Sequence, residues 1–113
     1  MRRDADVLIE DALQAIALIH QITKHGDVGI YEQDPVGCAA VERQFEIIGE
    51  ALNRLSRHHP DLARTLTDLP RIIAFRNLIA HGYDVIDQQA VWQVVTTKLP
   101  ALEASLRQML PGA

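Results

Sequence analysis

The sequence predicts an all-α fold: an antiparallel up-and-down four-helix bundle with one extra short helix. Apolar residues recur at spacings of three and four along nearly the whole chain, which is the period of an amphipathic helix. The alternation of β-branched and aromatic residues that marks strands is scarce. Four long helical segments joined by short connections favour an antiparallel bundle, and 113 residues suffice for one core. We therefore expect residues 1–113 to form a single domain.

The first helix is expected over residues 4–25, where apolar residues follow one another at alternating steps of four and three. These are Leu8, Ala12, Ala15, Ile19 and Ile22. Residues 26–34 contain two glycines that break this pattern, so a short linker is expected there. Asp34 and Pro35 should begin the second helix, because an aspartate caps first-turn N–H groups and proline fits the first helical position.

The second helix repeats the same steps and is expected to end near residues 57–59, ahead of Pro60. Its apolar face consists of Val41, Phe45, Ile48, Leu52 and Leu55. Residues 60–66 predict a brief helical turn. Gly49 lies inside the second helix, where glycine costs about 1 kcal/mol relative to alanine, and it indicates a close helix approach within the bundle or between two copies. Glu46 and Glu50 lie four apart on one face, where they would assist as a base or bind a cation, but such pairs are usually solvated and we expect the same here.

A third long helix is expected over residues 70–81, and its apolar residues cover most of its circumference. These are Ile72, Ile73, Phe75, Leu78 and Ile79, which predict the most buried element of the fold. Asp87 should cap a final helix that extends to Met109. Pro100 should kink or restart this helix, because proline cannot donate to the helical hydrogen-bond ladder.

Charge and cysteine content exclude several classes of protein. The chain has 11 Lys and Arg against 15 Asp and Glu, a net charge of -4, which argues against a general nucleic-acid binder held by a large positive field. A site for a polyanion must therefore be local. Cys38 is the single cysteine, so there is no disulfide framework, and a reducing cytoplasmic location is expected. We expect neither a signal peptide nor a membrane span.

The remaining histidines and the tryptophan favour structural roles. His20 and His25 have no acidic or cysteine partner at ligand spacing, and His58 and His59 are adjacent and point apart. No metal and no cofactor is therefore expected. Trp92 is expected to anchor the core or an interface.

The most informative segment is Arg76-Asn77-Leu78-Ile79-Ala80-His81, followed by Gly82-Tyr83. On a regular helix Asn77 and His81 share one face, whereas Arg76 is rotated by roughly 140° from His81. Gly82 is suited to end the helix, because glycine adopts the left-handed conformation cheaply. Four reactive side chains would thus gather at one helix end.

These residue types suit phosphodiester chemistry. Arginine carries a permanent charge that matches phosphate oxygens, and histidine, with an ordinary pKa near 6.5, exchanges protons at neutral pH. Cleaving RNA without a metal requires a base, an acid and positive charge at the phosphate. A two-fold dimer that apposes two motifs would supply a second His81 and a second Arg76. Tyr83 would stack on a base or donate to a phosphate.

Judged by its spacing alone, Arg-x4-His is a pattern that often arises by chance. In a purely structural interpretation, Arg76 would pair with a carboxylate and His81 would cap the helix. Longer stretches of sequence carry more information. Met1–Asp4, Arg43–Ala51, Phe75–Tyr83 and the segment from Val91-Trp92 to Leu99-Pro100 together resemble the HepT-like toxins of the HEPN domain superfamily. The resemblance extends over nearly the whole chain in order and spacing.

This resemblance implies a HEPN-like helical bundle that dimerises and acts as the toxin of a type II toxin-antitoxin pair. Such a toxin is a metal-independent endoribonuclease that cuts RNA, tRNA or mRNA, at the dimer cleft. By position, Arg76 and His81 would be catalytic, and Asn77 and Tyr83 would contact the substrate. The implied partner is a minimal nucleotidyltransferase antitoxin, which would inactivate the toxin by transferring AMP to Tyr83.

A second hypothesis belongs to a different class of protein. The same residues would hold a nucleotide or the partner without cutting RNA, and the helical dimer would serve only as a substrate of the nucleotidyltransferase. Catalysis requires His81, whereas binding survives the loss of His81 as long as Arg76 remains. The sequence leaves both hypotheses open.

Overall fold

The computed structural model describes residues 2–24, 26–66, 69–81 and 86–111, and of residues 2–3 and 77–81 it describes only the helical backbone. Regular secondary structure in this part of the chain is entirely helical, which confirms the all-α prediction. The longer helices are α1 (Arg2–Thr23), α3 (Pro35–His58), α5 (Leu69–His81), α6 (Gln88–Thr97) and α7 (Leu99–Met109).

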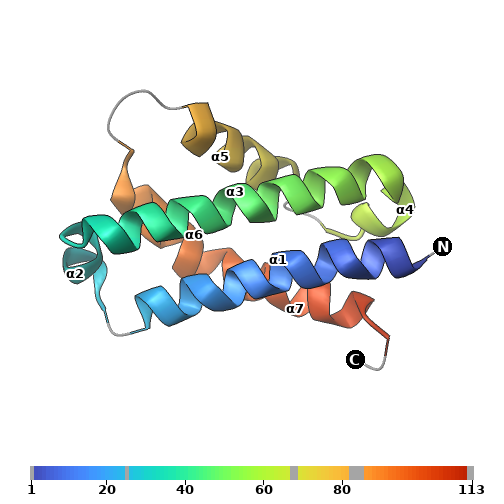
Figure 1. Ribbon diagram of the computed structural model, residues 1–113, viewed down its shortest axis with the longest axis horizontal. Helices are drawn as coiled ribbons and strands as arrows, with labels where there is room; N and C mark the ends of the chain where they lie inside the picture. Colours follow the sequence, from blue (N-terminus) through green and yellow to red (C-terminus); the bar gives the residue numbers. More distant parts are fainter. Residues whose placement is uncertain (1, 25, 67–68, 82–85, 112–113) are drawn as a thin grey trace.

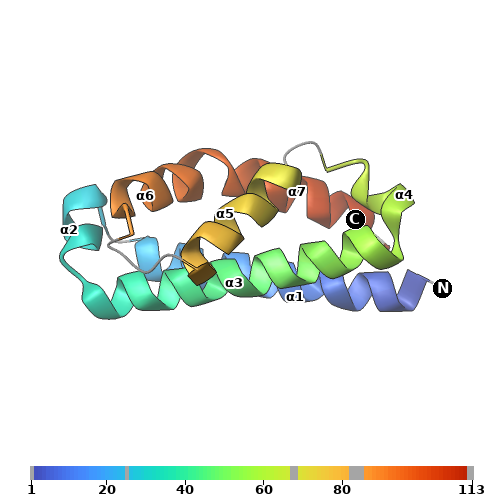
Figure 2. The same cartoon turned by 90° about the horizontal axis from the view of Figure 1, so that it is seen from above.

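The long helices run alternately in opposite directions, as the bundle prediction requires. In Figure 1, α1 and α3 lie side by side and antiparallel, and α5 follows the outer side of α3. Helices α6 and α7 follow each other almost directly and together form the fourth rod of the bundle. The view from above shows this rod lying across from α3 (Figure 2).

The core lies between α1, α3 and the α6–α7 rod, and α1 and α3 contribute most of its buried side chains. The predicted apolar face of α3 is buried along its whole length, with Phe45, Ile48 and Leu52 at most 1% exposed. The side chains that oppose this face and are most completely buried are Ile9, Ile16 and Ile19 of α1, Val91 of α6, and Leu99 and Leu106 of α7.

The predicted helix boundaries are confirmed at three positions. The Asp34 carboxylate accepts a hydrogen bond from Gly37 N at 3.0 Å and begins α3, and the Asp87 carboxylate accepts one from Ala90 N at 3.2 Å and begins α6. The final helix restarts at Leu99 with Pro100 in its first turn. The extra short helix is α4 (Pro60–Ala63).

One short helix lies where the sequence predicted a linker. Within residues 26–34 the chain forms α2 (Val28–Glu32), which begins where the Asp27 carboxylate accepts a hydrogen bond from Ile30 N at 3.0 Å. A five-residue helix makes little more than one turn, so it has no periodic pattern to detect. Its formation depends on the contacts that its one buried side chain makes.

That side chain is Tyr31, and it joins α2 to the start of α6. The ring packs against Trp92 with centroids 5.4 Å apart, so Trp92 is a packing anchor as predicted. The Tyr31 hydroxyl donates to Gln88 Oε1 at 2.7 Å, and Gln88 Nε2 donates to Glu42 Oε2 of α3 at 2.6 Å. Burial raises the pKa of the Tyr31 hydroxyl well above its ordinary value, so it stays protonated and remains a donor.

The prediction that the third long helix is the most buried element is wrong for its described side chains, residues 69–76. Leu69 and Ile72 are buried, but Ile73 and Phe75 are only partly covered. The reason is that α5 packs mainly on α3, whereas α3 is covered from several sides. An apolar pattern around a helix therefore does not mean that its own chain covers it.

Two surveys of the described residues bear on ligands and membranes. No helix there is long and apolar enough to cross a membrane. No group of three or more His, Cys, Asp and Glu side chains in this part of the chain is arranged to hold a metal ion.

Candidate functional site

Arg76 lies on α5 with the aliphatic part of its side chain directly over Gly49 of α3. A Cβ atom added at Gly49 would collide with the Cβ and Cγ atoms of Arg76 and would lie 3.0 Å from its Cδ. The close helix approach predicted from Gly49 is thus confirmed as an approach within the bundle. The glycine is needed because the backbone of α3 forms the surface on which the arginine stem rests.

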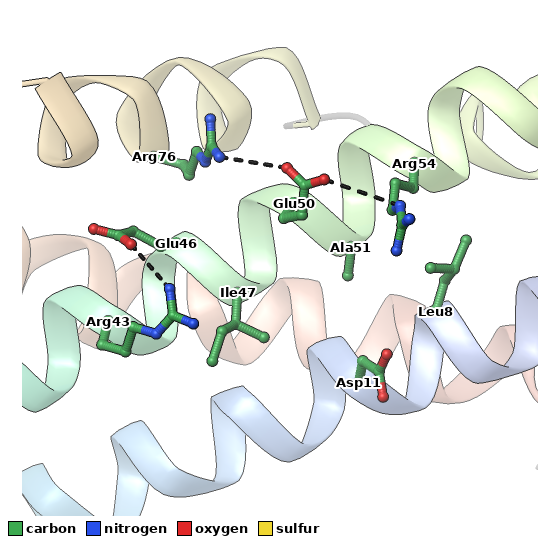
Figure 3. A pocket seen from close by; sticks show the side chains of 9 residues that line it. All are labelled: Leu8, Asp11, Arg43, Glu46, Ile47, Glu50, Ala51, Arg54 and Arg76. Atoms are coloured by element: carbon green, nitrogen blue, oxygen red, sulfur yellow. Dashed lines mark hydrogen bonds and ion pairs between the residues drawn. The ribbon is translucent and has the colours of Figure 1, made fainter.

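The guanidinium group of Arg76 reaches the next residue of α3. Its Nη2 atom lies 3.3 Å from Glu50 Oε2, while Glu50 Oε1 faces Nε of Arg54 at 3.9 Å. Figure 3 shows the carboxylate between the two arginines. The Glu50 side chain is 49% exposed, which agrees with the expectation that it is solvated, and the pairing of Arg76 with a carboxylate, which the sequence left open, is observed. Two guanidinium groups around one carboxylate carry one excess positive charge.

These residues border a surface hollow of about 240 Å³ between α1, α3 and α5. Its lining residues are Leu8, Asp11, Arg43, Glu46, Ile47, Glu50, Ala51, Arg54 and Arg76 (Figure 3). Along α3 the two glutamates lie between the two arginines, and Arg43 pairs with Glu46 at 3.2 Å much as Arg54 faces Glu50. The hollow is open and its lining combines charged with apolar residues, unlike an enclosed apolar cavity, which suits a charged, extended ligand better than a small apolar one.

Helix α5 is also held against α3 by an aromatic contact one residue before the motif. Phe75 meets the fully buried Phe45 of α3 edge to face, with ring centroids 5.1 Å apart. Such aromatic pairs favour this geometry. The Phe75 contact and the Arg76 contact fix the same turn of α5 to α3.

The other predicted site residues follow Arg76 on the same helix or beyond it. The α5 backbone is helical through Asn77 as far as His81, so the expected spacing of the motif on one helix is confirmed. The side chains of Asn77 and His81 lie outside the described residues, as do Gly82 and Tyr83. The roles assigned to these residues remain predictions.

Sequence reasoning missed Glu50 as a partner of the motif. Glu50 and Arg76 are 26 positions apart, so no helical periodicity in the sequence relates them. The only available signal was the neighbouring Gly49, which marks where another helix comes close. A polar residue next to such a glycine is well placed to contact whatever lies on it.

The fold and the site define a class: small helical-bundle proteins that carry an arginine-histidine motif on one helix and hold the arginine against its neighbour. The profile of the family described as "Ribonuclease HepT-like" matches residues 12–109. The chain belongs to this HepT-like ribonuclease family of the HEPN superfamily.

Three named relatives are similar over almost their whole length. A protein named as a probable ribonuclease HepT from Thermococcus cleftensis is 27% identical over 111 residues, which cover 96% of this chain and 98% of the relative. A provisionally named RNase from Methanocaldococcus jannaschii is 26% identical, covering 90% and 93%. Another from Caldanaerobacter subterraneus subsp. tengcongensis is 24% identical, covering 90% of each chain. No solved structure matches.

The contact between Gly49 and Arg76 predicts that Gly49→Ala destabilises the fold. Overpacking costs about 1–3 kcal/mol, and the better helix propensity of alanine recovers up to about 1 kcal/mol. We expect a net loss of about 1–2 kcal/mol in the free energy of unfolding, measured by urea denaturation. The control is Gly29→Ala, where the new Cβ meets only Asp27 Oδ1 at 3.4 Å. Equal stability of the two variants would contradict the tight contact.

Proposed function

We propose that this protein is a metal-independent endoribonuclease, the toxin of a type II toxin-antitoxin pair, which cuts RNA at a cleft between two copies of the chain. The observation that carries the proposal is the placement of Arg76, which is anchored on α3 and lies on a helix that continues unbroken to His81. Membership in the HepT-like ribonuclease family and the ribonuclease names of three relatives support it.

The proposed chemistry divides among four residues. Arg76 binds the non-bridging oxygens of the scissile phosphate and stabilises the charge that develops there. His81 exchanges a proton with the attacking 2′-hydroxyl or with the leaving 5′-oxygen. Asn77 orients the reacting groups, and Tyr83 stacks on a base or donates to a phosphate. One chain provides one such histidine, so a complete acid-base pair takes a second copy.

The exposed side of α5 supports this dimer. Ile73 and Phe75 are only partly covered in the single chain, although both pack against the core. Helix α5 packs mainly on α3, so the uncovered parts of Ile73 and Phe75 are available to a second copy. Burial of such surface is the main driving force for stable association.

Regulation by a nucleotidyltransferase partner is part of the proposal. The Tyr83 hydroxyl would attack the α-phosphorus of ATP, form a bond to AMP, release pyrophosphate and lose its proton. A bulky anionic nucleotide two residues from His81 would block RNA sterically and compete for Arg76. The toxin would thus be inactivated at the residues that bind its substrate.

Incubation of end-labelled tRNA and total RNA with the purified chain in EDTA tests the ribonuclease activity. We expect cleavage by the wild type, a loss of roughly 10²-fold or more in His81→Ala, and about 10²–10³-fold in Arg76→Ala. Variants are matched for fold by circular dichroism. No cleavage by the wild type, or equal cleavage by all three, would indicate the non-catalytic binding module instead.

Light scattering at micromolar concentration tests the shared cleft, and twice the mass of a single chain is expected. On dilution below the dissociation constant, the rate per chain should fall, because monomers lack the second histidine. A monomer that cuts RNA at an unchanged rate per chain would rule out this mechanism.

Intact-mass measurement after incubation with the partner nucleotidyltransferase, ATP and Mg²⁺ tests the modification. We expect a mass increase of whole AMP units that coincides with loss of ribonuclease activity and is absent in Tyr83→Phe. The matched control is Tyr31→Phe, because the chain has two tyrosines and Tyr31 is 4% exposed. Modification of Tyr83→Phe would place the acceptor elsewhere.

A further inference from the structure

The motif arginine is held at both ends of its side chain by two consecutive residues of a different helix. Gly49 supports the stem, and Glu50 binds the guanidinium group through the 3.3 Å contact of Oε2 with Nη2. An arginine side chain has many rotamers, and fixing one of them costs conformational entropy. A binding site in which that cost is met on folding is preorganised for its ligand.

The surroundings of Glu50 suit orientation better than stabilisation. Its side chain is 49% exposed, so water and salt screen its attraction to arginine, and exposed ion pairs contribute little to stability. The direction of the hydrogen bond is less sensitive to screening than its energy, because a carboxylate oxygen accepts an N–H only within a limited range of angles. The pair therefore fixes where the guanidinium points.

A carboxylate beside a phosphate site normally repels the substrate, and here a second arginine offsets that effect. Arg54 faces the other carboxylate oxygen at 3.9 Å, so the three side chains together keep one excess positive charge. The side chain of Arg76 is 28% exposed, which leaves part of it in reach of an RNA phosphate at the surface hollow. The arrangement combines a fixed arginine with a local positive charge.

We propose that Glu50 is a positioning residue for RNA cleavage, which holds the guanidinium of Arg76 in the orientation that receives the scissile phosphate. The inference rests on the proposed ribonuclease function and adds a residue from α3 to a site otherwise built on the motif helix and the residues after it. Glu50 touches Arg76 and not the reacting atoms, so it acts through the arginine.

The test compares Glu50→Ala and Glu50→Gln with the control Glu103→Gln in the EDTA assay. Glu103 of α7 also lies between two side chains, Arg107 at 3.0 Å and His20 at 3.3 Å, but it does not line the hollow. Misplacing a catalytic group by about 1 Å costs on the order of 10²-fold in rate, so kcat should fall about 10–100-fold in Glu50→Ala. KM should change by no more than about 3-fold, because the charge that attracts RNA is not reduced. Glutamine keeps one acceptor oxygen and should restore part of kcat.

The outcomes separate this proposal from the ribonuclease proposal. Cleavage by the wild type but not by Arg76→Ala, together with an unchanged kcat in Glu50→Ala, would overturn the role of Glu50 alone. Faster cleavage by Glu50→Gln would also overturn it, because Glu50 would then be a competitor of the phosphate. A loss of kcat in Glu103→Gln equal to that in Glu50→Ala would also overturn it, because the effect would then come from the charge of the whole surface and not from the contact with Arg76.

A second measurement does not depend on activity. The Nε–Hε signal of Arg76 in a nitrogen-proton NMR spectrum reports how rigid the side chain is on the ps–ns timescale. Its order parameter should fall in Glu50→Ala and stay unchanged in Glu103→Gln, with the melting temperature of each variant close to that of the wild type. An unchanged order parameter in Glu50→Ala would refute the positioning role even if the wild type does not cut RNA.

Discussion

The contact of Arg76 with Gly49 is the constraint on which the candidate site depends. It holds α5 close to α3 and fixes the position of the Arg76 side chain on the surface of α3. The guanidinium group therefore lies next to Glu50. The adjacent contact of Phe75 with Phe45 fixes the same turn of α5 from the side of the core. Packing and electrostatics thus act on neighbouring residues, so that one turn of α5 is both part of the fold and part of the site.

Much of this architecture was predictable because it depends on local rules. The alternating steps of four and three in α1 and α3 define one buried face each, and Asp34 and Asp87 cap helices through their own first turns. Helix α2 was not predictable, because its five residues depend on Tyr31 meeting Trp92, which is distant in sequence. The burial of the α5 side chains was overestimated for a related reason. Periodicity shows that a helix face is apolar, but it does not show which other part of the chain covers that face.

The same distinction applies to the site. The motif from Arg76 to His81 could be found and its chemistry argued, because residue type and helical spacing determine what the side chains can do. The environment of Arg76 could not be predicted, since Glu50 reaches it from another helix and Arg54 faces the same carboxylate. The net charge of -4 describes the whole chain, whereas the lining of the hollow is balanced, with three basic and three acidic residues. Within it, Arg76, Glu50 and Arg54 together carry one excess positive charge, and the proposed function would use this local excess to bind a phosphate.

The close packing over Gly49 also restricts how the sequence of this protein can change over time. Any side chain at position 49 would occupy the space of the Arg76 stem, so the two positions are not independent. A chain that keeps arginine at position 76 in this packing is confined to glycine at 49. Replacing the arginine by a smaller residue removes its Cγ and Cδ atoms but leaves its Cβ atom, which by itself collides with a side chain at position 49. The glycine is therefore required by the approach of α5 to α3 and not only by the arginine, and it should persist in chains that lose the arginine but keep this helix packing.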